Sequence, residues 1–230
     1  MAKINEELRT LEIFEIEILE LLNKKKVLDQ LYFGGGTMLR MCHNLNRYST
    51  DLDFWVKPDT DPDKIFIALK DIFSEEYILI DNQNKHFTLV IQLKSPGSKR
   101  SLKIEIRKEQ TDFEWERKIA FSTFTTIQVQ VRGLTLAQMM KNKISALISR
   151  KVIRDCFDID FLHKRGIQLP KEKEQLRSML GIIQGFNEKD FKVTLGSLLD
   201  TEEREFYNET KFTFLEQEIT ARINTINEKK

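Results

Sequence analysis

The chain has 230 residues, with 37 Lys and Arg against 36 Asp and Glu, so its formal net charge is +1. This length allows one large or two small domains with a sizeable core. The charge balance argues against a protein that binds DNA through a strongly basic surface, because such binding depends on neutralising many phosphates. The apolar runs are short and interrupted by charge, so we expect no membrane span.

The N-terminus and the cysteines both favour a cytoplasmic protein. The segment Met1 to Arg9 contains acidic and polar residues and lacks the apolar stretch of a secretory signal. Cys42 and Cys156 are the only cysteines and lie far apart in the sequence, which favours reduced thiols over a disulfide. We therefore expect a cytoplasmic location.

The first elements lead into a run of three glycines. Apolar residues recur at helical spacing between Leu8 and Leu22, which predicts one or more helices over 3–30. A short strand at 28–33 and a helix at 37–46 are predicted on either side of the sequence GGGT. A glycine turn of this kind allows backbone N–H groups to approach an anion closely.

Two aspartates follow in the sequence DLDFWV, which is predicted to be a buried strand. Because side chains alternate along a strand, Asp51 and Asp53 lie on the same face. Two carboxylates flanked by apolar residues are costly unless a cation lies between them. Mg²⁺ prefers oxygen ligands, keeps several waters and bridges one or two carboxylates to substrate phosphates. The stretch therefore predicts a Mg²⁺ site beside a phosphate-binding turn.

The middle of the chain is predicted to complete a sheet. Asp61 or Asp63 is expected to cap a helix at 64–73. The alternative, a calcium loop, lacks the glycine and the terminal Glu of an EF-hand. Strands are predicted at 77–80, 86–93, 102–107 and 127–132, with a hairpin-like turn at 95–101.

The strand LKIEIR offers a third acidic residue. Ile104 and Ile106 alternate with polar residues, which places Glu105 on the polar face of the sheet. Glu105 is therefore the candidate for a third acid beside the aspartate pair, and Glu109, beyond the strand, is a weaker one. In the alternative interpretation Glu105 is a surface residue that pairs with Lys103 or Arg107.

Beyond residue 134 the pattern becomes helical. A long helix is predicted from Leu136 to His163, with a break near Lys151, and helical segments continue at 171–186, 188–200 and 202–228. The predicted fold is α/β (α+β), with a mixed sheet flanked by helices in residues 1–134 and a helical domain in residues 135–230.

Charged residues form a stripe along the first of these helices. In a continuous helix one quadrant would hold Lys143, Leu147, Arg150, Arg154 and Asp158, with Asp155 at its border. One interpretation is a solvated face with pairs four residues apart. The other is a set of cations that hold a triphosphate and offset charge during phosphoryl transfer.

These stretches carry a resemblance to a known family. The sequence GGGTMLRM…NRYSTDLDFWV resembles the first motif of the nucleotidyltransferase superfamily, in the form found in the AbiEii/AbiGii toxin family. The later KISALISRKVIRDCFDIDFL is similar to the second signature of that family. Both occur in the right order and cover most of residues 33–162, whereas residues 171–230 carry no motif. The resemblance implies a minimal polymerase-β-like fold with a helical domain.

The resemblance also implies roles for individual residues in the first motif. Gly35, Gly36 and Thr37 would bind the triphosphate of a nucleotide. Arg47 and Ser49 would orient the aspartate pair or reach the nucleotide. Metal would be bound by Asp51, Asp53 and Glu105, although the family usually has Asp at the third position.

In the second signature the resemblance makes Lys143 and Asp155 the essential pair. Arg150 and Arg154 would lie near phosphate. With Asp51 and Asp53, Lys143 and Asp155 are the residues expected to be catalytic.

The implied activity is Mg²⁺-dependent transfer of a nucleoside monophosphate from an NTP to an acceptor hydroxyl, on a tRNA or other RNA end or on a protein. The chain would then be the toxin of a type IV-like abortive-infection toxin–antitoxin system, with a cognate antitoxin as partner. Two alternatives remain open. The acceptor would be a small molecule such as an aminoglycoside, or the chain would be a noncatalytic nucleotide-binding or interaction module of the same fold.

Overall fold

The computed structural model describes residues 2–95 and 100–228. Contacts divide the chain into two compact units, Met1–Thr135 and Leu136–Lys230, which we call the N-terminal and C-terminal units. Within the described ranges, no helix combines the length and the apolar character that crossing a membrane requires. Residues 96–99 of the turn predicted at 95–101 lie outside the described residues.

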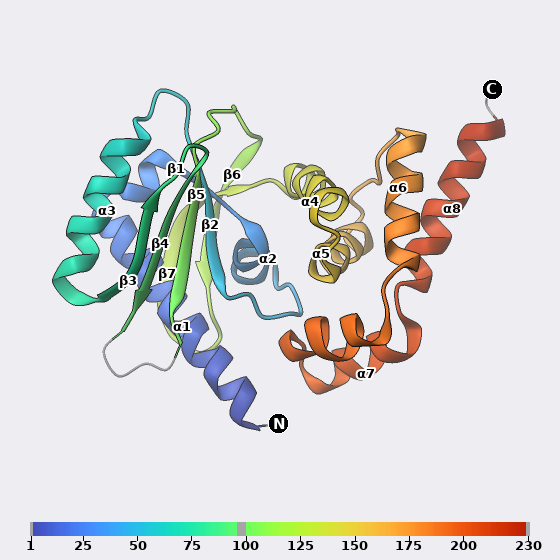
Figure 1. The fold of residues 1–230 in the computed structure, drawn as a ribbon, viewed down its shortest axis with the longest axis horizontal. Coiled ribbons are helices and arrows are strands. Elements are labelled where there is room, and N and C mark those ends of the chain that lie inside the picture. The colour runs from blue at the N-terminus through green and yellow to red at the C-terminus, as the bar shows by residue number, and fades with distance from the viewer. Residues whose placement is uncertain (1, 96–99, 229–230) are drawn as a thin grey trace. The chain divides into compact units, whose positions relative to one another are not determined.

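The N-terminal unit is built on a seven-stranded mixed sheet (Figure 1). The strand order is β3-β4-β5-β2-β1-β7-β6, in which β1 runs parallel to β7 and β2 parallel to β5. The sheet confirms the predicted mixed α/β fold. The elements are α1 (Ala2–Lys24), η1 (Val27–Gln30), β1 (Leu31–Gly34), α2 (Gly35–His43), β2 (Asp51–Val56), α3 (Pro62–Glu76), β3 (Ile78–Asn84), β4 (Thr88–Lys94), β5 (Leu102–Arg107), β6 (Trp115–Phe121) and β7 (Gln128–Leu134).

Local sequence explains where several of these elements begin and end. The Asp61 carboxylate accepts hydrogen bonds from the backbone N–H groups of Asp63 and Lys64, which caps α3 as predicted. Pro62 follows at the start of the helix, where its missing N–H costs nothing. The strand predicted at 102–107 is confirmed with the same bounds as β5.

The two faces of the sheet differ in burial, as the alternation predicts. Leu52, Phe54, Ile104 and Ile106 are buried and form one face of the core. The helices α1 and α3 meet on one side of the sheet, because the Phe14 ring of α1 lies 5.5 Å from the ring of Tyr77 at the end of α3. Asp51, Asp53, Lys103 and Glu105 point to the opposite face, which we call the polar face, and are only partly buried.

The strand β6 was not predicted from the sequence. Its outward side carries Trp115, Ile119 and Phe121, which are exposed, whereas Ala120 is the small apolar residue on its buried side. Among the strands that the structure describes, β6 forms the edge of the sheet and pairs with β7 alone. Because the large apolar side chains of β6 point to solvent, its sequence lacks the alternation by which a strand with a buried apolar face is recognised.

The C-terminal unit is helical throughout, as predicted. Lys151 has φ of 53° and separates two helices, which confirms the predicted break. The elements are α4 (Leu136–Arg150), α5 (Ile153–Lys164), α6 (Lys173–Gln184), the π-helix η2 (Asp190–Leu195), the 3₁₀-helix η3 (Gly196–Leu198), α7 (Thr201–Thr210) and α8 (Thr213–Glu228).

The last two predicted helical segments differ in detail from the structure. Residues 188–200 contain a π-helix and a 3₁₀-helix in place of an α-helix. Residues 202–228 form two helices, because Lys211 has φ of 53° and ends α7. Phe212 follows it and is buried against the rings of Phe191 and Tyr207, so tertiary packing fixes the turn.

A polar network is buried in the core of the C-terminal unit. The Tyr207 hydroxyl of α7 donates to Asp160 Oδ2 of α5 at 2.6 Å. The Lys164 ammonium lies 2.7 Å from the same oxygen. Burial, and then the charge and hydrogen bond of Asp160, raise the pKa of Tyr207 above its ordinary value. Tyr207 is therefore a neutral donor that ties α7 to α5.

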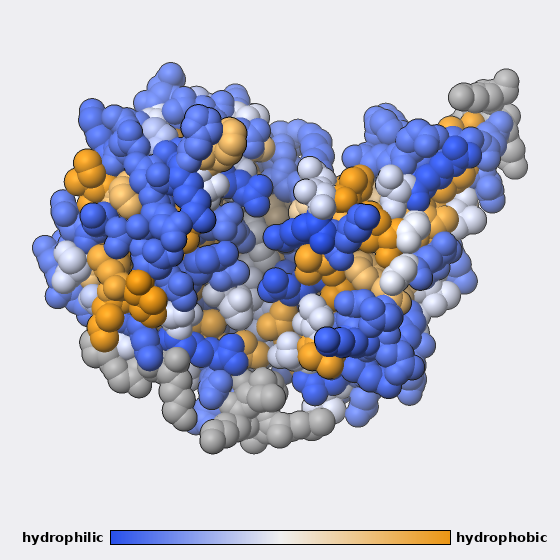
Figure 2. Space-filling model, in the orientation of Figure 1, coloured by the Kyte–Doolittle hydropathy of each residue, from blue (hydrophilic) through white to orange (hydrophobic). Residues whose placement is uncertain are grey.

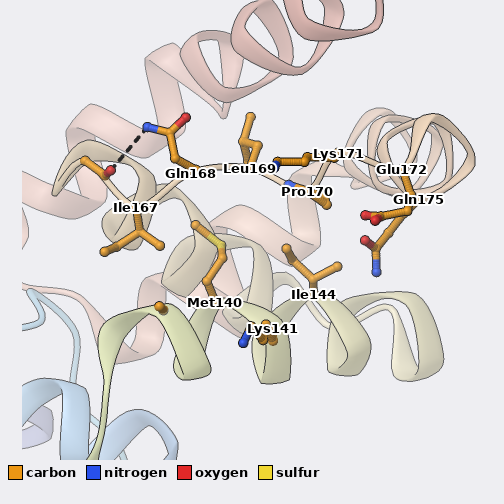
Figure 3. A pocket seen from close by; sticks show the side chains of 12 residues that line it. Met140, Lys141, Ile144, Ile167, Gln168, Leu169, Pro170, Lys171, Glu172 and Gln175 are labelled. Atoms are coloured by element: carbon orange, nitrogen blue, oxygen red, sulfur yellow. Dashed lines mark hydrogen bonds between the residues drawn. The ribbon is translucent and has the colours of Figure 1, made fainter. Parts of the chain in front are cut away.

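The C-terminal unit also contains a cavity of about 620 Å³ (Figure 3). Met140 and Ile144 of α4 form one wall, and the segment from Ile167 to Pro170 forms the opposite wall. None of the residues predicted for the functional site lines it. In the space-filling view most of the visible surface is hydrophilic, with separate hydrophobic patches on both units (Figure 2).

Candidate functional site

The glycine turn packs directly on the aspartate strand. Gly35, at the start of α2, has φ of 74°, and a Cβ at this position would lie 2.2 Å from Asp53 Oδ2. Only glycine is compatible with both the positive φ and the close carboxylate. The turn and the strand predicted to form one site are therefore in direct contact.

Thr37 joins the same two elements. Its hydroxyl donates a hydrogen bond of 2.6 Å to the backbone carbonyl of Asp51. The residue is fully buried. The side chain thus fixes α2 against β2, and the backbone of Gly35 and Gly36 is the part of the turn that suits a phosphate.

Arg47 and Ser49 lie beside the second glycine of the turn. A Cβ on Gly36 would lie 2.5 Å from Arg47 Nη2 and 2.8 Å from Ser49 Oγ. Arg47 is buried, and its Nη1 donates to the backbone carbonyl of Tyr48 at 2.9 Å. The structure therefore brings Arg47 and Ser49 to the turn, on the segment that leads into β2.

Glu105 is the direct neighbour of Asp53 across the sheet. The parallel strands β2 and β5 place Asp51 opposite Lys103 and Asp53 opposite Glu105, so all four side chains share the polar face. The Lys103 ammonium lies 3.2 Å from Glu105 Oε2. The ion pair between Glu105 and Lys103 is the one that the alternative interpretation of Glu105, as a surface residue, predicted.

Lys103 carries its positive charge among these carboxylates, in an ion pair with Glu105. Partial burial by itself lowers the pKa of Lys103, but the carboxylates of Asp51, Glu105 and Asp53 outweigh burial and raise the pKa above its ordinary value. The ammonium is therefore fully protonated at neutral pH.

The donor set fits a divalent cation at the aspartate pair. Asp51 and Asp53 present oxygen ligands on one face, and the carboxylates already hold a cationic side chain close to them. Among residues 2–95 and 100–228, no three His, Cys, Asp or Glu side chains are grouped so as to hold a metal ion. Two carboxylates that share Mg²⁺ with substrate phosphates and water match this arrangement.

A cleft of about 570 Å³ opens next to this group. Glu105 and Arg107 of β5 line it, together with Thr88 of β4 and the exposed ring of Phe87. The Arg107 guanidinium lies 5.1 Å from the centre of the Trp55 ring. Glu109, the weaker candidate for a third acid, also lines this cleft.

Glu15 of α1 is a buried acid that sequence reasoning did not single out. Neither of its carboxylate oxygens has a hydrogen-bond partner among the described side chains and backbone. Burial, and the charges of Glu12, Asp51 and Asp53, raise the pKa of Glu15 well above its ordinary value. The sequence feature that could have indicated Glu15 is its position as an acidic residue on the apolar face of the predicted first helix.

In the C-terminal unit the second signature forms a buried ion network. Lys143 Nζ of α4 lies 2.6 Å from Asp158 Oδ2 and 3.4 Å from Asp155 Oδ1 of α5. Arg150 Nε and Nη2 each donate to Asp155 at 2.7 Å, in a two-point interaction. Lys143, Asp155 and Asp158 are all buried.

This network changes two expectations from the sequence. In the interpretation of the stripe as a solvated face, Asp158 would pair with Arg154, four residues earlier, whereas in the structure Asp158 contacts Lys143 of the preceding helix. Arg154 is half-buried and, in the part of the chain that the structure describes, takes no part in the network. The break at Lys151 separates the stripe into two helices, so one continuous helical face does not exist.

Comparisons with solved structures agree with this fold. The protein JHP933 from Helicobacter pylori is 19% identical, with a TM-score of 0.50, and the match covers 94% of this chain and 96% of that one. A second Helicobacter pylori structure, of a protein assigned as a nucleotidyltransferase, is 19% identical with a TM-score of 0.51, covering 90% of this chain and 96% of that one. At this identity the likeness concerns the fold. No curated protein sequence matches the chain.

The family match covers nearly the whole chain. The model of the nucleotidyl transferase AbiEii toxin family, of type IV toxin–antitoxin systems, matches residues 17–226. These residues include the glycine turn, the aspartate pair and the buried ion network described above. The chain therefore belongs to the AbiEii toxin family of nucleotidyltransferases.

Proposed function

We propose that this protein transfers a nucleoside monophosphate from an NTP to the hydroxyl of an RNA end, with Mg²⁺ held by Asp51 and Asp53. The observation that carries the proposal is the contact between the glycine turn and the aspartate strand, where Gly35 leaves no room for a Cβ beside Asp53. That contact supports the proposal, because phosphoryl transfer would need backbone that can hold phosphate next to carboxylates that can hold metal.

The residues of the N-terminal unit have distinct proposed tasks. The backbone of Gly35 and Gly36 would hold the triphosphate, and Thr37 fixes that backbone to β2 through its hydrogen bond to Asp51. Arg47 and Ser49 lie beside Gly36 and would orient the nucleotide. When bound, Mg²⁺ offsets the charge that develops on the phosphate oxygens.

The buried ion network of the C-terminal unit would hold the side chains of the second signature in position. Lys143 and Asp155 are proposed as the essential pair of the second signature, and Arg150 keeps half of its side chain exposed while it holds Asp155. An exposed guanidinium with a fixed orientation suits a phosphate group. Arg154, outside the network, is proposed only as a further phosphate contact. A cognate antitoxin is the partner that a type IV system implies.

The test is label transfer from NTPs that carry ³²P at the α-phosphate. The full chain is offered each of the four NTPs with total RNA, with a protein extract or with an aminoglycoside. We expect Mg²⁺-dependent labelling of RNA, which Asp51→Asn reduces by at least a hundredfold and Asp71→Asn, an exposed acid on α3, leaves unchanged.

The other outcomes assign the acceptor or reject the activity. Labelling confined to protein or to the aminoglycoside would replace the RNA acceptor while retaining the transfer. If no acceptor is labelled with any NTP, or if Asp51→Asn retains full activity, the proposed function is wrong.

A further inference from the structure

Lys103 is a cation built into the acidic face of the sheet. It lies opposite Asp51 across β2 and β5, and its ammonium is 3.2 Å from Glu105 Oε2. None of the sequence motifs includes Lys103. A cationic side chain that pairs with one of the carboxylates expected to bind metal therefore requires its own explanation.

The formal charges of Asp51, Asp53, Glu105 and Lys103 match one divalent cation, while Arg107 lies further along the same face, over the Trp55 ring. Asp51, Asp53 and Glu105 together carry three negative charges, and Lys103 carries one positive charge, which leaves a net charge of −2. One Mg²⁺ neutralises that charge. A further metal ion bound through Glu105 would have to compete with the ammonium for the carboxylate, against the repulsion between like charges.

The arrangement of the side chains also favours a single metal ion. In the described part of the chain no three acidic, histidine or cysteine side chains are grouped to hold a metal, although Glu105 adjoins Asp53 across the sheet. The carboxylate of Glu105 is instead used by Lys103. An ammonium at ion-pair distance can supply the positive charge that a second metal ion supplies in two-metal sites.

We propose that Lys103 holds Glu105 as an internal counter-ion, so that the site binds a single divalent cation on Asp51 and Asp53. The proposal rests on the proposed function, because it concerns the same metal site. It revises the expected role of Glu105 from a metal ligand to the partner of Lys103. Lys103 is then the residue that keeps the Glu105 carboxylate from binding a metal ion.

The test counts bound Mn²⁺ by electron paramagnetic resonance, on the full chain without nucleotide. The wild type should bind one Mn²⁺. Lys103→Met removes the competing charge, so we expect about tenfold tighter binding of Mn²⁺. The double variant with Lys103→Met and Glu105→Gln loses a neutral pair, and its Mn²⁺ affinity should stay within about threefold of the wild type. Lys70→Met, an exposed lysine on α3, is the matched control and should change nothing.

Two results would overturn the proposal. One is a wild type that binds two Mn²⁺ ions, of which the double variant loses one. The other is a double variant that binds Mn²⁺ at least tenfold more weakly than the wild type, as Asp53→Asn should. The double variant keeps the test decisive if Lys103→Met alone does not fold. Because Mn²⁺ is counted without NTP or acceptor, failure here is distinct from failure of the label-transfer assay.

Discussion

Replacing Gly35 by alanine should disrupt the site through a single methyl group. The backbone φ of 74° costs an alanine about 1–2 kcal/mol relative to glycine. The new Cβ would also lie 2.2 Å from Asp53 Oδ2 and 2.7 Å from Asp53 Cβ, so the aspartate must move. Overpacking of this kind costs about 1–3 kcal/mol, which gives a total loss of about 2–5 kcal/mol in the free energy of unfolding.

Gly133→Ala is the matched control in the same unit. Its Cβ would approach the flexible side chain of Lys118 no closer than 3.3 Å, and Gly133 lies in a strand. We expect a change below about 1 kcal/mol, because alanine suits a strand better than glycine and the lysine can shift.

Urea unfolding followed by tryptophan fluorescence suits this comparison, because both tryptophans, Trp55 and Trp115, lie in the N-terminal unit. Gly35→Ala should also weaken Mn²⁺ binding, since Asp53 is displaced, whereas Gly133→Ala should not. If Gly35→Ala is as stable as the wild type and binds Mn²⁺ equally well, the close contact between the turn and Asp53 is not a feature of the site.

Three further predictions concern the buried polar groups. Because burial raises the pKa of Glu15 above its ordinary value, the folded chain keeps a proton that the unfolded chain loses. Stability therefore falls by up to about 1.4 kcal/mol per pH unit as the pH rises from the ordinary pKa of Glu to the raised pKa of the folded chain. Glu15→Gln should flatten this fall as the pH rises above about 5, measured by urea unfolding without metal, and exposed Glu17→Gln should not. Lys143→Met should lower the free energy of unfolding by about 3–5 kcal/mol, because it leaves buried carboxylates without their ammonium. Arg154→Met, measured alongside by circular dichroism, should cost less than about 0.5 kcal/mol. Tyr207→Phe removes the donor to a buried carboxylate and should cost about 1–3 kcal/mol, seen as a lower melting temperature; an unchanged value would contradict the network.

The sequence predicts best those elements whose pattern and packing agree. In β5 the alternation of isoleucine with polar residues yields the strand, its bounds and the shared face of Asp53 and Glu105. The cap at Asp61 is equally local, because one side chain satisfies two backbone N–H groups. The glycine turn and the aspartate pair were predicted to lie together, and the structure places them in contact.

Features that depend on tertiary packing could not be predicted in this way. The strand β6 has its large apolar residues on the outside, so its hydrophobic pattern points away from the core. Helical periodicity relates residues only within one helix. The turn at Lys151 puts Lys143 on α4 and both Asp155 and Asp158 on α5, so the periodicity does not predict how these side chains meet. The bond between Lys143 and Asp158 therefore follows from the packing of α4 on α5.

Buried acids are the second kind of feature that the pattern leaves open. Glu105 alternates with isoleucines whether it binds metal or pairs with Lys103, and only the structure shows the ion pair. Glu15 lies in an apolar stretch of α1, but its proximity to the charges of Asp51 and Asp53 depends on how α1 packs in the fold.

The chemistry proposed for the site is the transfer of a nucleoside monophosphate, and not of the γ-phosphate, from an NTP. The most direct measurement compares NTPs labelled at the α-phosphate and at the γ-phosphate in parallel reactions with the full chain and total RNA. The acceptor should gain only the α-label, and pyrophosphate should carry the γ-label in an equal amount. Transfer of the γ-label to the acceptor, or release of the γ-label as inorganic phosphate without labelled acceptor, would contradict the proposed chemistry.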